Sequence, residues 1–195
     1  RQQPGHHQEA DFVDIRRDRD LHTVCIETPK GTGKDFEMAL GVWLLTREFL
    51  IQNRSEIMPV YELDPNTFIS INLTNRTETQ AKSVTFRDVL PKFNVPFFND
   101  YFPPQISIEK IMEDRVYPAE LRFPKNTVLF AGTGSASTGI GYTLASLVMD
   151  EANFMVKSAS GDRGMSGAGE YDAAKETYKD GKDRLFSRFS CFRNR

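Results

Sequence analysis

Residues 28–35 have the residue types and spacing to bind the phosphates of a nucleotide. They read Thr-Pro-Lys-Gly-Thr-Gly-Lys-Asp, with the glycines and the lysine of a phosphate-binding loop between a strand and a helix. In such a loop, Gly31 and Gly33 let backbone N–H groups surround the phosphates, and Lys34 reaches the β- and γ-phosphates. Nucleotide hydrolysis is therefore the leading hypothesis. The predicted nucleotide-binding residues are Pro29, Lys30, Gly31, Thr32, Gly33, Lys34 and Asp35.

The loop departs from the usual pattern at both ends. Thr28 replaces the first glycine, and Asp35 replaces the Ser or Thr whose hydroxyl normally holds magnesium. A carboxylate can bind Mg²⁺ directly, but it repels the triphosphate by up to about 4 kcal/mol at about 4 Å and an effective dielectric of about 20. We predict that Asp35 is a metal ligand; the alternatives are that it only caps the helix, or that the whole segment is a turn without a nucleotide.

A second candidate group lies far downstream, where the apolar residues 147–149 end in Asp150 and Glu151. An apolar strand that ends in two carboxylates is typical of a buried parallel strand opening into a site, and this one looks like a Walker B element. Asp150 would hold the magnesium ion, and Glu151 would orient the water that attacks the γ-phosphate. The alternative is a strand that simply ends in two solvated acids.

The elements that must position these groups follow from the hydrophobic pattern. Strands are predicted at 23–27, 67–73, 106–111, 120–123, 127–131 and 144–149, and helices from residue 36 to 50, from 76 to Pro91 and from 170 to 187. Residues 53–65 and 93–104 are predicted to be turns and loops. Strands and helices alternate, which predicts an α/β fold with a mostly parallel sheet between helices.

Two glycine-rich segments are further candidate sites. Residues 132–141 resemble a dinucleotide fingerprint, but a strand follows them where a helix is required, so we reject a Rossmann cofactor site. Residues 158–169 are predicted to be a surface loop; the alternative is a mobile element that senses the nucleotide or touches a polymer.

Composition is that of an ordinary globular enzyme domain. The chain has 195 residues, 39% hydrophobic and 27% charged, with a formal charge of -2, so any nucleic-acid contact must rest on a local patch. We expect a polar arm over residues 1–20 and one ATPase domain over residues 21–195. The two cysteines, Cys25 and Cys191, lack metal-ligand spacing. Without a signal peptide or a long apolar run, we expect a soluble protein in a reducing compartment.

Four segments in this order resemble the ATPase domain of the large terminase subunit of tailed bacteriophages. They are the loop 29–35, the helix start 77–82, the run from Ser135 and Gly139 to 148–152, and the helix end from Tyr178 to 184–189. The resemblance spans about residues 20–190. It implies a P-loop NTPase of the ASCE type, with an additional strand between the two Walker strands, that uses ATP and Mg²⁺ to drive double-stranded viral DNA into a capsid. It also implies a portal protein and a small terminase subunit as partners, a ring oligomer, no membrane, and action in the host cytoplasm.

By the same resemblance, Lys34 is the phosphate lysine, Asp150 the metal residue and Glu151 the catalytic carboxylate. Lys30 stands where the family often has a second basic residue, usually Arg, so we include it among the catalytic candidates although a lysine cannot form the bidentate fork. Arg184 and Arg188 are the candidate arginine fingers, with Arg122 a further possibility; a solvated basic helix end is the alternative.

Two parts of the family's pattern lie outside this sequence: the coupling motif would lie past Arg195, and the nuclease domain is missing. We therefore expect the chain to be a piece of a longer polypeptide. Several alternative functions stay open. A helicase of superfamily 1 or 2 would share the acidic pair but needs a second motor domain. A small-molecule kinase would share the phosphate-binding loop but is not expected to have the acidic pair Asp150 and Glu151 at the end of a strand late in the chain. A scaffold protein that retains the loop without using it would have no enzymatic activity.

Overall fold

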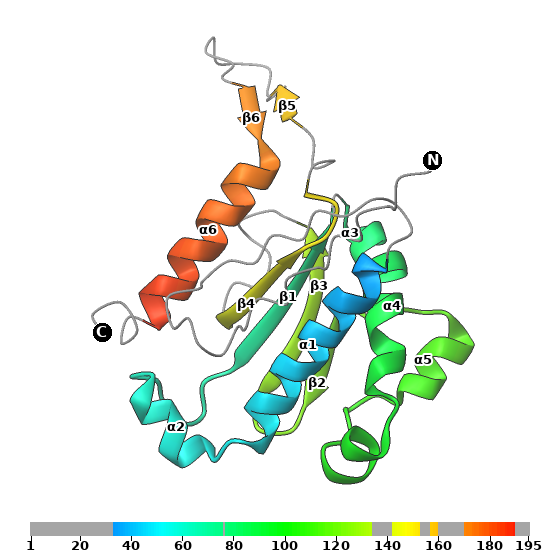
Figure 1. The fold of residues 1–195 in the computed structure, drawn as a ribbon, viewed down its shortest axis with the longest axis vertical. Helices are drawn as coiled ribbons and strands as arrows, with labels where there is room; N and C mark the ends of the chain where they lie inside the picture. Colours follow the sequence, from blue (N-terminus) through cyan, green and yellow to red (C-terminus); the bar gives the residue numbers. More distant parts are fainter. Residues whose placement is uncertain (1–32, 76, 134–141, 153–156, 160–169, 190–195) are drawn as a thin grey trace, which may run out of the picture. The chain divides into compact units, whose positions relative to one another are not determined.

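Four strands form a mixed sheet at the centre of the described part of the chain (Figure 1). The computed structural model describes residues 33–75, 77–133, 142–152, 157–159 and 170–189. The chain divides into two compact units, residues 1–34 and 35–195, and only Gly33 and Lys34 of the first are described. The predicted arm, the strand at 23–27 and the loop up to Thr32 thus lie outside the described residues. No helix in the described ranges is long and apolar enough to cross a membrane.

The sheet has the order β2-β3-β1-β4, and its strands are β1 (Ile69–Asn75), β2 (Glu120–Phe123), β3 (Thr127–Thr133) and β4 (Thr143–Met149). Strand β1 pairs in parallel with both β3 and β4, and β2 pairs with β3 antiparallel. All seven residues of β1 are buried, as expected of a strand covered on both faces. The predicted α/β class is confirmed, and four of the predicted strands are present: β2 has the predicted bounds and the other three have shifted ends.

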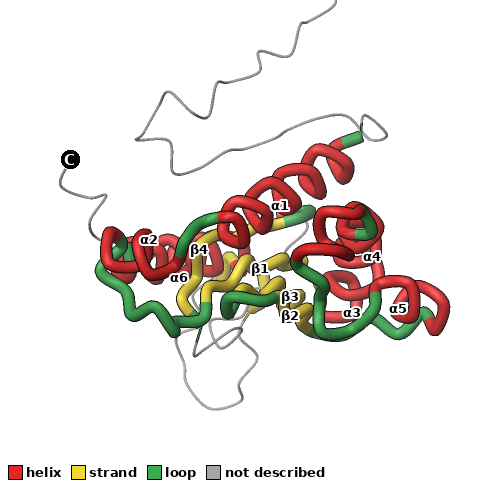
Figure 2. Tube along the Cα trace, turned by 90° about the horizontal axis from the view of Figure 1, so that it is seen from below, coloured by secondary structure: helices red, strands yellow, loops and turns green. Residues whose placement is uncertain are grey.

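Helix α1 (Lys34–Ile51) packs on one face of this sheet (Figure 2). Its buried side chains include Ala39, Val42 and Leu50, which share a core with Ile71 of β1 and Leu129 of β3. The ammonium group of Lys125, in the turn just before β3, donates to the carbonyl oxygens of Leu50 (2.5 Å) and Gln52 (3.0 Å). Helix α1 therefore ends at the amino end of β3 and runs antiparallel to the parallel strands, so its start lies toward their carboxyl ends.

A helical segment over residues 78–93 covers the same face. It comprises α3 (Glu78–Gln80), the π-helix η1 (Ala81–Phe86), α4 (Arg87–Val89) and the 3-10 helix η2 (Leu90–Phe93). The hydroxyl of Thr77 accepts from the backbone N–H of Gln80 (3.2 Å) and caps the start. The predicted helix exists, but it does not stop at Pro91, because that proline sits in the first turn of η2, where its missing N–H is not needed.

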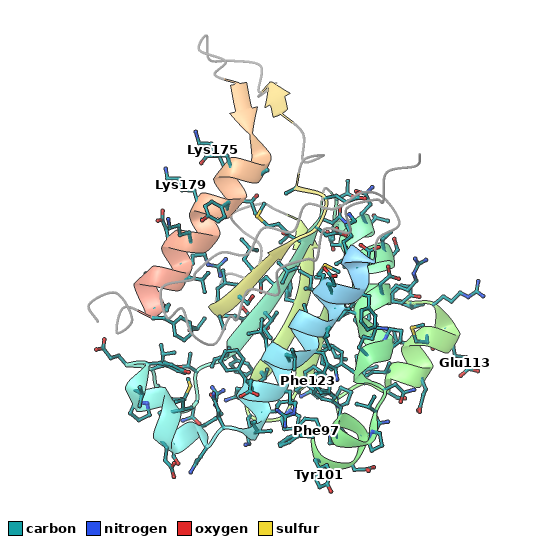
Figure 3. The ribbon with its side chains drawn as sticks, viewed as in Figure 1. Phe97, Tyr101, Glu113, Phe123, Lys175 and Lys179 are labelled. Atoms are coloured by element: carbon teal, nitrogen blue, oxygen red, sulfur yellow. The ribbon has the colours of Figure 1, made fainter. Side chains whose placement is uncertain are left out.

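Three further sequence predictions were wrong or incomplete. The strand expected at 106–111 is helix α5 (Ile108–Asp114): the Ser107 hydroxyl caps it, and Ile108 and Ile111 bury together at helical spacing. The connection at 53–65 contains helix α2 (Arg54–Val60), capped by Asn53. The loop at 93–104 contains a π-helix, η3 (Phe97–Tyr101), whose buried Phe98 ring lies 5.6 Å from the Phe123 ring, whereas Tyr101 points away from the core (Figure 3).

The chain after β4 continues as a two-stranded antiparallel ladder of β5 (Lys157–Ala159) and β6 (Glu170–Asp172), followed by α6 (Ala173–Arg188). The predicted helix thus begins three residues later than expected, because residues 170–172 pair as a strand. Helix α6 packs on β4 through Gly181, where an added Cβ would lie 2.3 Å from Leu147 Cδ2. Because Val148 packs against the core that α1 shares and side chains alternate along a strand, Leu147 and α6 lie on the opposite face of the sheet.

Candidate functional site at the carboxyl ends of the parallel strands

Strands β1 and β4 end side by side, and each ends in a polar residue. Asn75 is the last residue of β1, and Asp150 follows the last residue of β4. The backbone N–H of Asp150 donates to Thr74 O (2.9 Å), which extends the ladder to the acid. The sequence-predicted metal residue therefore lies at the carboxyl end of a parallel strand, where open α/β sheets bind ligands.

Two buried side chains hold the carboxylate of Asp150. Its Oδ2 accepts hydrogen bonds from Thr85 Oγ1 (3.0 Å) and from Asn75 Nδ2 (3.2 Å), and Asn75 Nδ2 also lies 3.1 Å from Thr85 Oγ1. Asn75 is 2% exposed and Thr85 is 1% exposed, whereas Asp150 is half-buried. The carboxylate is thus oriented by donors from β1 and from η1.

Neither Asn75 nor Thr85 was predicted as a site residue. Asn75 ends a strand, like Asp150, but a lone asparagine at that place has many structural roles. Thr85 shares the buried side of its helical segment with apolar Ala81, Phe86 and Val89, and a buried hydroxyl among apolar residues needs a partner. A polar residue on an apolar helix face was therefore the signal in the sequence that Thr85 needs a hydrogen-bond partner, although the sequence does not identify Asp150 as that partner.

Glu151 has the left-handed backbone conformation, with φ 52°. This conformation is uncommon for residues other than glycine, and strain of this kind gathers at functional sites. It turns the chain sharply after β4, so that the half-buried Glu151 side chain follows Asp150 at the strand end instead of continuing the ladder. Asp150 and Glu151 are thus both half-buried in a turn at the end of β4.

The described end of the predicted phosphate loop is the start of α1. Gly33 has φ 89°, a conformation that favours glycine, and α1 begins at Lys34 with Asp35 exposed in its first turn. Pro29, Lys30, Gly31 and Thr32 lie outside the described residues. Since α1 is antiparallel to the parallel strands, the first turn that carries Asp35 is at the same edge of the sheet as Asp150.

The residues of this edge fit a magnesium ion that arrives with a nucleotide. In the described ranges, no three His, Cys, Asp or Glu side chains gather closely enough to hold a metal by themselves. Magnesium in nucleotide enzymes usually takes one or two protein carboxylates and fills its other positions with phosphate oxygens and water. An oriented carboxylate such as Asp150 meets that requirement without a full protein cage.

The candidate arginines lie at the other end of β4. Arg184 Nη2 lies 3.5 Å from Tyr142 O, just before β4 begins, and eight residues of extended chain separate Tyr142 from Asp150, roughly 26 Å at about 3.3 Å per residue. Helix α6 runs antiparallel to β4, from Gly181 beside Leu147 to Arg184 beside Tyr142. Arg188, one turn further on, is therefore still more distant from Asp150.

Arg122 is bound in a separate cluster. Its guanidinium donates to Glu120 Oε1 (2.7 Å from Nε) and to the Tyr142 hydroxyl (3.0 Å), and that hydroxyl donates to Glu120 Oε2 (3.0 Å). The hydrogen bond to Glu120 raises the pKa of Arg122, and burial followed by the Glu120 hydrogen bond raises the pKa of Tyr142. This cluster also lies toward the amino end of β4, which argues for a structural role of Arg122.

Comparison with known proteins leaves the family unassigned: no family model, no curated protein and no solved structure matches this chain.

Asp35 gives a first test of the site. If its carboxylate binds Mg²⁺, Asp35→Asn raises the magnesium concentration needed for half-maximal ATPase activity by about 10-fold, since a neutral amide attracts the cation less strongly. If Asp35, the second residue of α1, only interacts with the helix dipole, Asp35→Asn lowers the stability of the helix slightly and the magnesium requirement stays the same. A magnesium titration at saturating ATP decides between them. Glu37→Gln is the control, because it removes a negative charge from the same exposed helical turn.

Proposed function

We propose that this chain is an ATPase of the P-loop class. The observation that carries the proposal is the acidic pair at the end of β4: Asp150 is held by two buried donors, and Glu151 follows in a left-handed conformation. A carboxylate that is fixed in place suits a metal ligand, and a second one beside it suits a residue that orients water. The glycine-rich loop before α1 supplies the matching phosphate site.

Each residue then has a distinct task. The backbone of residues 29–33 and the ammonium group of Lys34 bind the phosphates, with Lys30 as a further cation. Asp150, with Asp35, holds the magnesium ion, which neutralises phosphate charge when it is bound with ATP. Glu151 accepts a hydrogen bond from the attacking water and aligns it with the γ-phosphate. The arrangement of α1 antiparallel to β1 and β3 supports this assignment, because it brings the helix start to the strand ends.

We further propose that the ATPase is a DNA-packaging motor of the terminase type, with an ASCE-type sheet. The support is the order of the sequence segments that resemble terminases, together with the edge geometry of β1 and β4. We expect DNA to contact α6, where Lys175 and Lys179 project on the side away from the sheet (Figure 3) and Lys182 is also exposed, together with the acidic Glu176 and Asp183. Lysines on one helix side attract a phosphate backbone without reading its sequence.

The position of the candidate fingers predicts that the motor works between copies. Arg184 and Arg188 lie too far along β4 to reach a γ-phosphate beside Asp150 of the same chain, so an arginine finger from α6 would have to act on a neighbouring copy. An arginine supplied by a neighbour is worth about 10³–10⁵ in rate. We therefore expect a slow ATPase at high dilution and a rate per molecule that rises with protein concentration or on double-stranded DNA.

The measurement is ATPase rate against concentration, with Arg184→Ala and Arg188→Ala compared with Arg115→Ala, an exposed arginine at the end of α5. The proposal expects one of the α6 variants to remove the concentration dependence. A high rate that stays constant on dilution would exclude a required arginine from a neighbour.

A further inference from the structure

The Asp150 carboxylate is held by side chains from two other elements. Asn75 comes from the end of β1 and Thr85 from the π-helix η1, and both donate a hydrogen bond to the same oxygen, Oδ2. The amide of Asn75 also reaches the Thr85 hydroxyl, so the three groups form a closed triangle with sides of 3.0 to 3.2 Å. Two donors on one oxygen fix both the rotamer and the tilt of a carboxylate.

We propose that Asn75 and Thr85 are positioning residues, which hold Asp150 in the orientation that a nucleotide-bound magnesium ion requires. This inference rests on the proposed ATPase function. Groups that orient a metal-binding carboxylate usually contribute 10- to 100-fold to metal affinity without touching the metal.

Burial supports this role. A carboxylate in water is oriented only loosely, because solvent competes for its oxygens. Asn75 and Thr85 are almost fully excluded from solvent, so their hydrogen bonds to Asp150 are made in a low-dielectric environment where they are stronger and more directional. Asp150 itself is half-buried and so remains accessible to a ligand.

The local helix geometry supports it too. Thr85 lies within residues 81–86, which form a π-helix between two short α-helices. π-helical segments inside α-helices are rare and occur frequently at functional sites. Here the widened segment buries Ala81, Thr85 and Phe86 against the sheet together, and so brings a hydroxyl to Asp150 within an apolar surface.

A purely structural role predicts a different outcome. If the triangle only joins β1, β4 and the helical segment, its loss lowers the free energy of unfolding and leaves the magnesium requirement unchanged. If it positions Asp150, its loss raises the magnesium requirement beyond any effect on stability. The two roles therefore separate when stability and magnesium dependence are measured on the same variants.

The test uses Thr85→Val, which keeps the shape and removes the hydroxyl, and Thr85→Ser, which keeps the hydroxyl. Thr46→Val is the matched control, because Thr46 is also fully buried on a helix and its hydroxyl bonds only locally, to Val42 O at 2.8 Å. Asn75→Leu removes the second donor with little change of shape. For each we would measure thermal unfolding, ATP affinity without magnesium, and the magnesium concentration for half-maximal ATPase activity.

We expect Thr85→Val and Asn75→Leu to raise the magnesium requirement about 10- to 100-fold, while Thr85→Ser and Thr46→Val stay close to the unmodified chain. ATP affinity without magnesium should not change. An active unmodified chain with the same magnesium requirement in Thr85→Val and Asn75→Leu would overturn the positioning role and leave the ATPase proposal standing. Absence of ATP binding and hydrolysis in the unmodified chain would overturn both. If Thr85→Val does not fold, Asn75→Leu decides the question by the same comparison.

Discussion

Replacing Glu151 by glutamine is expected to leave ATP·Mg²⁺ binding intact and to lower turnover by about 10²–10⁴-fold. The amide has nearly the shape of the carboxylate, but it cannot take a proton from water or align it with the same charge. Since the loss arises in the chemical step, the affinity for the nucleotide should hold. Single-turnover hydrolysis and nucleotide binding, measured on equally folded proteins, separate the two effects.

The chain offers a matched control for this variant. Glu62 also has a left-handed backbone, with φ 59°, and is exposed. Glu62→Gln therefore makes the same substitution in the same backbone conformation, away from the strand ends, and should not change turnover. Nearly normal hydrolysis by Glu151→Gln would remove Glu151 from the mechanism, and equal losses in both variants would indicate an effect on folding rather than on chemistry.

The strand and acid pattern could be read directly from the sequence. The apolar run before Asp150 and the alternation before Asn75 predicted β4 and β1 to within two residues at every end, because burial on both faces leaves a strong hydrophobic signal. The edge at which their ends meet followed from parallel pairing. The location of Asp150 and Glu151 at a strand end is therefore the part of the site that sequence reasoning could reach.

The rest depended on interactions that periodicity does not encode. Ile106, Ile108 and Ile111 fit a strand as well as a helix, and the helix forms because Ser107 caps it and Arg115 ends it in a left-handed conformation. The partners of Asp150 come from 65 and 75 residues earlier in the chain, so only the folded topology brings Thr85 and Asn75 to it. The distance of Arg184 from Asp150 likewise depends on the antiparallel direction of α6 relative to β4, which cannot be predicted from the hydrophobic pattern.

Lys34 is the predicted phosphate lysine. It is the first residue of α1, and Asp35 and Glu37 follow in the same turn. The positive end of the helix dipole disfavours a cation at this place by about 0.3–1 kcal/mol, and alanine is a better helix former than lysine. For the stability of the helix alone, Lys34→Ala should therefore be neutral or slightly stabilising.

If Lys34 binds the β- and γ-phosphates, the same substitution has a large functional cost. A hydrogen bond to a charged group contributes about 1.5–3 kcal/mol, which corresponds to about 10- to 100-fold in nucleotide affinity, and turnover should fall together with it because the lysine also stabilises the transferring phosphoryl group. Equilibrium nucleotide binding, thermal unfolding and ATPase rate would be measured on one preparation, with Lys110→Ala on the exposed side of α5 as the control.

A variant that unfolds at an unchanged or higher temperature yet loses both binding and hydrolysis supports the phosphate role. Unchanged affinity with lower turnover would mean that Lys34 acts only on the transition state. Unchanged affinity and unchanged turnover would show that Lys34 does not bind the phosphates.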